Sequence, residues 1–281
     1  MKVVRTVDEV KAELAPRRAA GPIGLVPTMG ALHDGHRSLL RTARQAADAV
    51  VVSLFVNPLQ FGPHEDFSAY PRGEGADLAT CEQERVDVVF APNEAEMAME
   101  SGVTTVTVAG LSEVIEGAAR PSHFQGVCTV VAKLLNIVRP DVLFLGQKDA
   151  QQNAVIARLV EDLSYGVSLT VCPTVREPDG LALASRNAYL SSSQRADAGV
   201  LYRALVTGRE RIEDGATPEE AEKAMQGVLA AQQGVEPDYA RAVDPYSFKA
   251  PPDEGPVLLV LAARVGGVRL IDNLTVHLER G

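Results

Sequence analysis

Two histidines, His33 and His36, stand three residues apart in PTMGALHDGH (27–36), where an apolar run gives way to a helical pattern. Histidine is scarce in this chain, with five in 281 residues. Residues three apart at a helix start face the same side, and the helix N-terminus offers unpaired backbone N–H groups. Two imidazoles there could donate hydrogen bonds to phosphate oxygens and stabilise charge that develops at phosphorus. The spacing favours nucleotidyl transfer, with surface histidines in a turn as the alternative.

A metal site at this pair has less support, because zinc needs a third protein ligand and none stands at an obvious spacing. The sequence contains neither GxxxxGK[ST] nor GxGxxG, so it does not support a P-loop or a dinucleotide fingerprint. Gly30 and Gly35 instead allow a ligand to approach the backbone closely. We therefore expect phosphate binding within residues 29–36.

Two further clusters carry amide or cationic side chains. Asn57 and Gln60 lie among aromatic residues in FVNPLQF (55–61), and amides in apolar surroundings suit a small hydroxylated or carboxylated substrate. In LGQKDAQQ (145–152), Lys148 could contact a phosphate and Asp149 could cap a helix, although a solvated turn with a routine cap is the alternative.

Ser185 and Arg186 lie in the irregular segment REPDGLALASRN (176–187), which is typical of a mobile loop that closes on phosphates. A solvated loop is the simpler interpretation of this pair alone. Arg120 and His123 could add positive charge or serve structural roles, and the sequence does not separate the two.

The elements that must position these residues alternate between apolar strands and amphipathic helices. Strands are predicted at 21–28, 50–56, 87–92, 103–110, 141–146 and 167–175, and helices at 36–49, 75–86, 126–140 and 147–165. This alternation predicts an α/β domain over residues 1–180, with a doubly wound, Rossmann-like parallel sheet. Ligands of such sheets bind at the carboxyl ends of the strands.

The pattern changes after residue 180. Helices at 192–215 and 217–233 have capping sequences, Ser191 to Ser193 for the first and Thr217 with Glu220 for the second. Strands follow at 237–245, 255–265 and 267–274. We expect residues 181–281 to form a second, smaller α+β domain, hinged near residues 177–186 and acting as a lid.

Composition limits the class of protein. A formal net charge of −10 argues against a broad basic face for nucleic acid or an anionic membrane, so we expect small-molecule partners. Cys81, Cys128 and Cys172 are widely spaced, as expected for reduced, buried thiols. No apolar stretch approaches the ~20 residues of a membrane span, and the N-terminus lacks a signal-peptide core. These features favour a cytoplasmic location.

Several motifs in fixed order carry a family resemblance: PTMGALHDGH, FVNPLQF, RPSHFQGVCTVVAKLLNIVRPD, GQKD and VREPDGLALASRN. Together they resemble the pantothenate synthetase (pantoate–β-alanine ligase) family across nearly all of residues 22–192. That family belongs to the nucleotidyltransferases, whose HxGH motif is similar to His33–His36 and whose KMSKS-type loop is similar to the segment around Ser185. The resemblance implies a homodimeric ligase in which pantoate attacks the α-phosphate of Mg-ATP. Pantoyl adenylate and pyrophosphate form, and β-alanine then displaces AMP to give pantothenate.

The resemblance also implies residue roles. The catalytic residues would be His36, the family's proton donor, with His33, Lys148 and Arg186. The ATP-binding residues would be Met29, Gly30, His33, His36, Gly146, Gln147, Lys148, Asp149, Val175, Leu183, Ala184, Ser185 and Arg186. Gln60, Asn57 and Gln152 would bind pantoate or β-alanine, and magnesium would arrive with ATP rather than on an assigned protein ligand. The family usually has Met-Ser-Ser-Arg where this chain has residues 183–186, so Ala184 lacks one hydroxyl group.

Two other functions stay open. A nucleotidyltransferase acting on a phosphate ester or a pyridine nucleotide would need cations for the acceptor phosphate, whereas the NPLQF cluster favours a carboxylate. A catalytically silent ATP-binding module would bind nucleotide without turnover, and the presence of both histidines, Lys148 and Arg186 argues against it. The small size and acidic charge disfavour a tRNA-charging enzyme.

Overall fold

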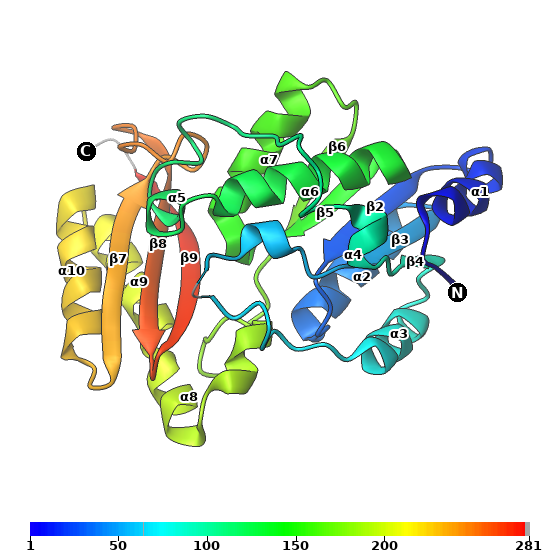
Figure 1. The fold of residues 1–281 in the computed structure, drawn as a ribbon. Helices are drawn as coiled ribbons and strands as arrows, with labels where there is room; N and C mark the ends of the chain where they lie inside the picture. Colours follow the sequence, from blue (N-terminus) through cyan, green and yellow to red (C-terminus); the bar gives the residue numbers. More distant parts are fainter. Residues whose placement is uncertain (64, 279–281) are drawn as a thin grey trace. The chain divides into compact units, whose positions relative to one another are not determined.

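The computed structural model describes residues 1–63 and 65–278, which form two compact units (Figure 1). The first unit comprises Met1–Gly146 and Val155–Cys172. The second comprises Gln147–Ala154 together with the described residues from Pro173 onward. Each unit has its own sheet and its own hydrophobic core.

The first unit contains a six-stranded parallel sheet, which confirms the predicted doubly wound α/β class. Its strands are β1 (Lys2–Val4), β2 (Ile23–Thr28), β3 (Ala49–Leu54), β4 (Val88–Phe90), β5 (Val142–Gly146) and β6 (Ser168–Cys172). Their spatial order is β1-β4-β3-β2-β5-β6. The chain progresses outward from β2 to β4 and then returns to place β5 on the other side of β2. Open α/β sheets bind ligands beyond the carboxyl ends of their strands at such a reversal.

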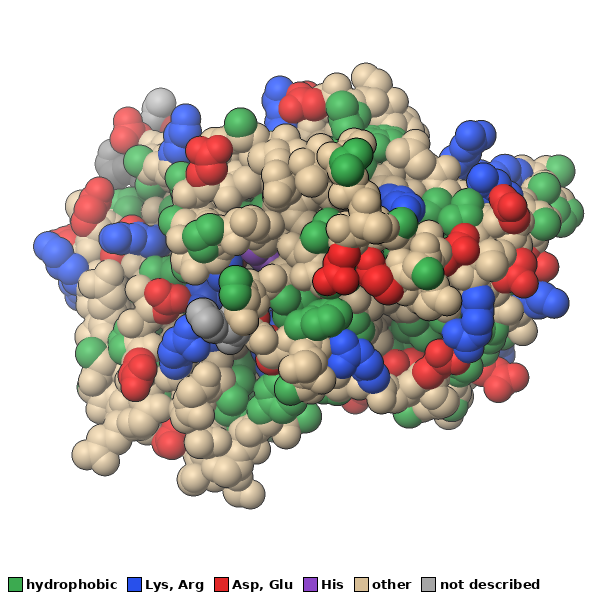
Figure 2. Space-filling model, viewed as in Figure 1, with side chains coloured by type: hydrophobic (Ala, Val, Ile, Leu, Met, Phe, Trp, Pro, Cys, Tyr) green, Lys and Arg blue, Asp and Glu red, His purple; other side chains and the backbone are tan. Residues whose placement is uncertain are grey.

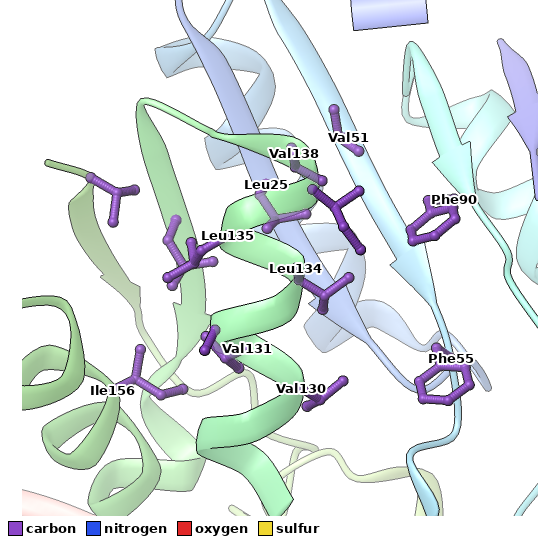
Figure 3. Close-up of a cluster of buried hydrophobic side chains, with 14 of the residues drawn as sticks. Leu25, Val51, Phe55, Phe90, Val130, Val131, Leu134, Leu135, Val138 and Ile156 are labelled. Atoms are coloured by element: carbon purple, nitrogen blue, oxygen red, sulfur yellow. The ribbon is translucent and has the colours of Figure 1, made fainter. Parts of the chain in front are cut away.

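Helices cover both faces of this sheet. They are α1 (Val7–Arg18), α2 (Asp34–Ala46), α3 (Glu74–Gln83), α6 (His123–Val138) and α7 (Ala150–Asp162). Successive strand residues point to opposite faces, so Leu25 and Val51 pack with α1 and α6, whereas Val26 and Val52 pack with α2 and α3. Figure 3 shows the apolar side of α6 turned toward Leu25 and Val51. Strands that are apolar on both faces are the expected pattern for a sheet covered twice.

The strand predicted at residues 103–110 is wrong. Val103 is 99% exposed, and the backbone N–H of Val106 donates to the Thr129 hydroxyl (3.0 Å) rather than to a neighbouring strand. Alternating Val and Thr residues are typical of a strand, but pairing in a sheet also needs a neighbour, which local pattern does not specify. The pattern also missed the edge strand β1 and the short helices α4 (Glu94–Met97) and α5 (Glu116–Ala119).

The second unit contains the antiparallel sheet β7-β8-β9 with helices packed on it. Its strands are β7 (Val235–Val243), β8 (Gly255–Val265) and β9 (Val268–Leu278), and its helices are α8 (Ser192–Ala198), α9 (Val200–Glu213) and α10 (Pro218–Ala231). Both helices begin at the predicted capping sequences: Ser191 forms a capping box with Gln194, and Thr217 forms one with Glu220. The helix predicted over 192–215 is divided at Gly199 into α8 and α9.

The second unit begins earlier than the predicted boundary at residue 181. It includes residues 147–154 and 173–180, and side chains of β9 contact both segments through hydrogen bonds and an ion pair. All three cysteines are buried and free, as predicted, and burial raises the pKa of Cys81 to about 12.

On the face drawn in Figure 2, acidic and basic side chains are interspersed. Within residues 1–63 and 65–278, no helix has the length and apolarity required to span a bilayer.

Candidate active site

The loop that follows β2 is held by a carboxylate from α3. Asp77 is buried and accepts hydrogen bonds from the backbone N–H groups of Ala31 (3.0 Å) and Leu32 (2.8 Å). Gly30 has φ +81°, and a Cβ at this position would lie 2.8 Å from Asp77 Oδ2, so the site requires glycine. Ala31 is also left-handed (φ 51°), at a cost of about 1–2 kcal/mol. Asp77 therefore stabilises a strained backbone that leads into His33.

The two histidines form the first turn of α2. His33 is the N-cap, and its Nδ1 accepts a hydrogen bond from the Gly35 N–H (3.1 Å). His36 Nδ1 accepts from the His33 N–H (3.2 Å), and the ring centroids are 4.2 Å apart. Because each Nδ1 is an acceptor, each neutral ring carries its proton on Nε2. The pair thus presents two Nε2–H donors at a helix N-terminus, which is a suitable arrangement for an anion.

Asn57 and Gln60 are brought together, as expected, but Asn57 is used internally. It is 1% exposed, and its Nδ2 donates to the Gly126 carbonyl (3.0 Å) and to Gln60 Oε1 (3.1 Å). Its Oδ1 accepts from the Leu59 N–H (3.3 Å) in the 3₁₀ turn η1 (Pro58–Gln60). The half-buried Gln60 donates from Nε2 to the sulfur of Met29 (2.9 Å). Asn57 is therefore placed to orient Gln60.

Arg120 and His123 hold the other side of Gln60. His123 Nδ1 lies 2.8 Å from the Gln60 carbonyl oxygen, and Arg120 Nη2 donates to the same oxygen (3.2 Å). A carbonyl only accepts, so His123 Nδ1 carries the proton and Nε2 is the partner of Arg120 Nη1 (3.1 Å). Burial, together with the Arg120 charge, lowers the pKa of His123 to about 4. His123 is therefore neutral at pH 7, so of the two roles that the sequence left open for it, positive charge and structure, the structural one applies.

The Arg120 charge is balanced within the same cluster. Its guanidinium contacts Glu65 (2.6 Å) and Glu116 (3.5 Å). Burial opposes ionisation of Glu65, but hydrogen bonds and the charge of Arg120 outweigh it and lower the pKa of Glu65. This network fixes the Gln60 backbone, a structural role that the sequence left open for Arg120.

The GQKD motif comprises Gly146, which ends β5, and a 3₁₀ turn, η2 (Gln147–Asp149), which lies directly before α7. The predicted helix over 147–165 thus begins three residues late. Lys148 Nζ lies 3.5 Å from Asp149 Oδ1. Gln152, which is half-buried, stands in the first turn of α7.

The turn η2 is bound to strand β9 by Asn273. Asn273 Nδ2 donates to the carbonyl oxygens of Gln147 (3.0 Å) and Lys148 (2.9 Å). Its Oδ1 accepts from Gln147 Nε2 (3.0 Å). Two hydrogen bonds from Asn273 therefore fix the peptide groups on either side of the Lys148 Cα, and the third holds the Gln147 side chain.

The segment predicted as a mobile loop contains a short hairpin. The Leu183 N–H donates to the Val175 carbonyl (3.0 Å), and Arg176 pairs antiparallel with Ala182. Gly180, with φ +93°, closes the turn. Val175 and Leu183, both expected near ATP, are thus directly paired by their backbones.

Ser185 and Arg186 follow in a 3₁₀ helix, η3 (Ser185–Tyr189), and both are half-buried. Ala184 occupies the N-cap position and has no side chain with which to cap the helix. A serine there could accept a hydrogen bond from a backbone N–H of the first turn. The difference from the usual family motif therefore falls at a position where a hydroxyl has a structural use.

Sequence patterns missed four residues that position this machinery: Asp77, Arg176, Asp272 and Asn273. Each has a partner that is remote in sequence, which local spacing does not reveal. For Asp272 and Asn273, the sequence offers one clue: two adjacent polar residues interrupt the apolar positions of the predicted strand at 267–274. Across residues 1–63 and 65–278, no three His, Cys, Asp or Glu side chains are grouped as metal ligands.

Comparisons with known proteins identify the family of this chain. The family model described as pantoate-beta-alanine ligase matches residues 2–275. A pantothenate synthetase of Acidothermus cellulolyticus is 50% identical over 97% of this chain and 90% of its own length. A bifunctional pantoate ligase/cytidylate kinase of Gloeobacter violaceus is also 50% identical, over the whole of this chain, which spans 56% of that protein.

Solved structures give the same result. Pantothenate synthetase from Thermus thermophilus is 45% identical, with a TM-score of 0.92 over 98% of this chain and 99% of that chain. A pantoate-beta-alanine ligase from Francisella tularensis, complexed with beta-gamma ATP and beta-alanine, is 34% identical, with a TM-score of 0.80 over 98% of this chain and 97% of that chain. With a family model over nearly its full length and relatives at half identity, the chain belongs to the pantoate-beta-alanine ligase family.

Proposed function

We propose that His33, His36, Lys148 and Arg186 carry out the ligase reaction of this family, with ATP bound by the segments around them. The reaction joins pantoate to β-alanine and converts ATP to AMP and pyrophosphate. In the first step the pantoate carboxylate attacks the α-phosphorus, and the bond from that phosphorus to pyrophosphate breaks. In the second step the β-alanine amine attacks the acyl carbon of pantoyl adenylate, loses a proton and expels AMP.

The observation that carries this assignment is the orientation of the two imidazoles. Both Nδ1 atoms accept backbone N–H groups, so each Nε2–H is the donor end of a ring fixed at a helix N-terminus. Donors held in place before reaction stabilise charge as it develops on phosphate oxygens. We assign His36 this hydrogen-bonding role rather than proton donation, because release of pyrophosphate requires charge stabilisation and adenylation has no evident need for an acid.

Lys148 and Arg186 supply the cations for the phosphates. Attack by a substrate carboxylate needs no enzyme nucleophile, so catalysis depends on positioning and on neutralising the leaving group. ATP contacts are proposed for Met29, Gly30, Gly146, Gln147, Asp149, Val175, Leu183, Ala184 and Ser185. The Francisella tularensis relative, complexed with beta-gamma ATP and beta-alanine, supports ATP and β-alanine as ligands of this chain.

Gln60 is proposed to bind pantoate first and β-alanine afterwards, and Gln152 to bind pantoate. The hydrogen bond from Gln60 Nε2 to the sulfur of Met29, in the loop proposed to bind phosphate, supports this role. Asn57 supports this role by orienting Gln60, since its own amide is engaged by Gly126, Leu59 and Gln60. An amide suits both substrates because it can accept from a hydroxyl or an amine and donate to a carboxylate.

Three further features are proposed from the family. Magnesium enters as Mg-ATP, since this ion usually binds to proteins through substrate phosphates and retains several waters. The chain acts as a homodimer, and it acts in the cytoplasm, where ATP is available.

Exchange of labelled pyrophosphate into ATP tests the proposed chemistry. With magnesium and pantoate present and β-alanine absent, we expect label to enter ATP at a rate that depends on pantoate. Lys148→Ala should lower this rate at least about a hundredfold while the protein remains folded. Exchange that needs a phosphate ester instead of pantoate would indicate the other nucleotidyl transfer. ATP binding without exchange under any acceptor would indicate a silent module.

A further inference from the structure

Strand β9 carries a buried polar pair, Asp272 and Asn273, which are 2% and 4% exposed. Their neighbours in register on β8 are Leu261 and Val260, both apolar. Burying an amide and a carboxylate costs free energy unless each is fully hydrogen-bonded. Apolar residues would suffice for the packing of this sheet. We therefore look for the role of the pair in the groups to which it is hydrogen-bonded.

Asn273 binds η2 at two successive carbonyl groups. Its Nδ2 hydrogens go to the oxygens of Gln147 and Lys148, and its Oδ1 accepts from the Gln147 side chain. These bonds span 2.9–3.0 Å, which is normal for strong amide hydrogen bonds. The peptide groups that bracket the Lys148 Cα are thus tied to a strand more than a hundred residues away.

Asp272 contacts the hairpin that joins Val175 to Leu183, the other segment of the second unit for which ATP contacts are proposed. It does so through Arg176. The Arg176 guanidinium makes a two-point contact with the Asp272 carboxylate (2.6 and 3.0 Å) and donates to the Asn273 carbonyl (3.1 Å). It also donates to the Gly180 carbonyl (3.0 Å), and it stacks over the Tyr202 ring at 4.3 Å. Two-point arginine–carboxylate contacts fix orientation as well as distance.

We propose that Asp272 and Asn273 are positioning residues that set the ATP-phosphate segments of the second unit from a single point on β9. Asn273 fixes the two peptide groups on either side of the Lys148 Cα, and so the direction in which the Lys148 side chain extends. Asp272, through Arg176, sets the hairpin that ends at Leu183 and leads into Ser185 and Arg186. This inference rests on the proposed function, since it assigns to Asn273 the placement of a lysine that acts on ATP.

A double-mutant cycle on Lys148 and Asn273 tests the proposal. Asn273→Ala should lower pyrophosphate exchange tenfold to a hundredfold and raise KM for ATP, with KM for pantoate unchanged. In the Lys148→Ala background the same substitution should have less than a threefold further effect, because the group that Asn273 positions is already gone. Asn273→Asp, which keeps the size of the side chain but lacks both donors, should behave like Asn273→Ala. Thr275→Ala, at an exposed position on the same strand, is the matched control.

The outcomes separate this inference from the proposed function. Equal losses from Asn273→Ala in the two backgrounds would overturn the positioning role, as would a loss that follows only the fraction of folded protein with KM for ATP unchanged. If Lys148→Ala alone exchanges pyrophosphate normally, the assignment of Lys148 is wrong and the inference falls with it. Urea unfolding of each variant supplies the folded fraction.

Discussion

The backbone N–H of Ala31 donates to the carboxylate of Asp77 at 3.0 Å, across 46 residues of sequence. A second bond, from Leu32, makes Asp77 the partner of two consecutive peptide groups. Consecutive N–H groups that point to one side form an anion-binding concavity, and here a protein carboxylate fills it. The loop between β2 and α2 is thus held in its strained form before any ligand arrives.

Replacing Asp77 by Asn should disturb the first turn of α2, which contains both histidines, without unfolding the chain. The asparagine oxygen can still accept one of the two backbone N–H groups. Its NH₂ group faces the other N–H, so that hydrogen bond is replaced by a contact between two donors. We expect a loss of about 1–3 kcal/mol in the free energy of unfolding and a tenfold to hundredfold lower kcat. Glu74→Gln, on the same helix but in a surface ion pair with Arg5, should leave kcat unchanged. Equal activity of the two variants would contradict the role given to Asp77.

The substitution His36→Asn distinguishes the structural role of Nδ1 from the proposed catalytic role of Nε2. The asparagine oxygen can replace Nδ1 as the acceptor for the His33 N–H, but the shorter side chain has no donor at the place of Nε2. We expect the helix start to persist and kcat to fall by two or more orders of magnitude, because the donor serves the transition state. Circular dichroism and single-turnover adenylation measure the two effects. His277→Asn, at an exposed histidine of β9, is the control, and near-normal turnover of His36→Asn would rule out the assignment.

Ala184→Ser should stabilise η3. A serine hydroxyl at the N-cap accepts a backbone N–H, an interaction of about 0.5–1 kcal/mol relative to alanine. We expect a corresponding rise in the free energy of unfolding of the second unit and a decrease of at most about fivefold in KM for ATP. Ala184→Val, which adds bulk without an acceptor, should give neither gain. If serine and valine behave alike in urea unfolding, the hydroxyl has no partner in this helix.

His123 should make stability depend on pH in a defined window. Burial and Arg120 lower its pKa from 6.5 to about 4, so between these values the unfolded chain binds a proton that the folded chain does not. Stability therefore rises with pH across this window and is lost as pH falls from 6.5 toward 4, by on the order of 3 kcal/mol in total. His123→Gln should remove this part of the pH dependence. Urea unfolding at about pH 7.5 and about pH 5, on either side of the upper limit, measures it. An identical slope in the variant would contradict the neutral, buried histidine.

Much of the first unit could be predicted from sequence because its strands and helices are set by local pattern. The β-branched run that forms β3 is apolar on both faces, and α2 has a regular stripe ending at Ala43. The caps at Ser191 and Thr217 were predictable for the same reason, since a cap involves residues three apart. The exposed segment at 103–110 could not be predicted, because its pattern matches a strand and only the absence of pairing tells otherwise.

The candidate site divides in the same way. Motifs identified His33, His36, Lys148 and Gln60, which would contact substrate, but not the residues that hold them. The partners of Ala31, Lys148 and Arg176 come from α3 and β9, and such contacts appear only when the chain has folded. The charge of His123 was also out of reach, because it depends on burial and on Arg120 rather than on residue type.

The tie between Asn273 and η2 has a consequence for the order in which the chain matures. During synthesis, Lys148 emerges more than a hundred residues before the strand that fixes it, whereas Asp77 follows Ala31 closely. Contacts of short sequence separation form early and those of long separation form late. We therefore expect that, in a nascent chain synthesised as far as α10, Asp77 already holds the loop that leads to His33 and His36. The turn η2, which contains Lys148, still lacks its hydrogen bonds to Asn273 at that stage. Emergence of β9 would then anchor the turn that contains Lys148, so that a newly made ligase gains the ability to adenylate only after this strand has been synthesised.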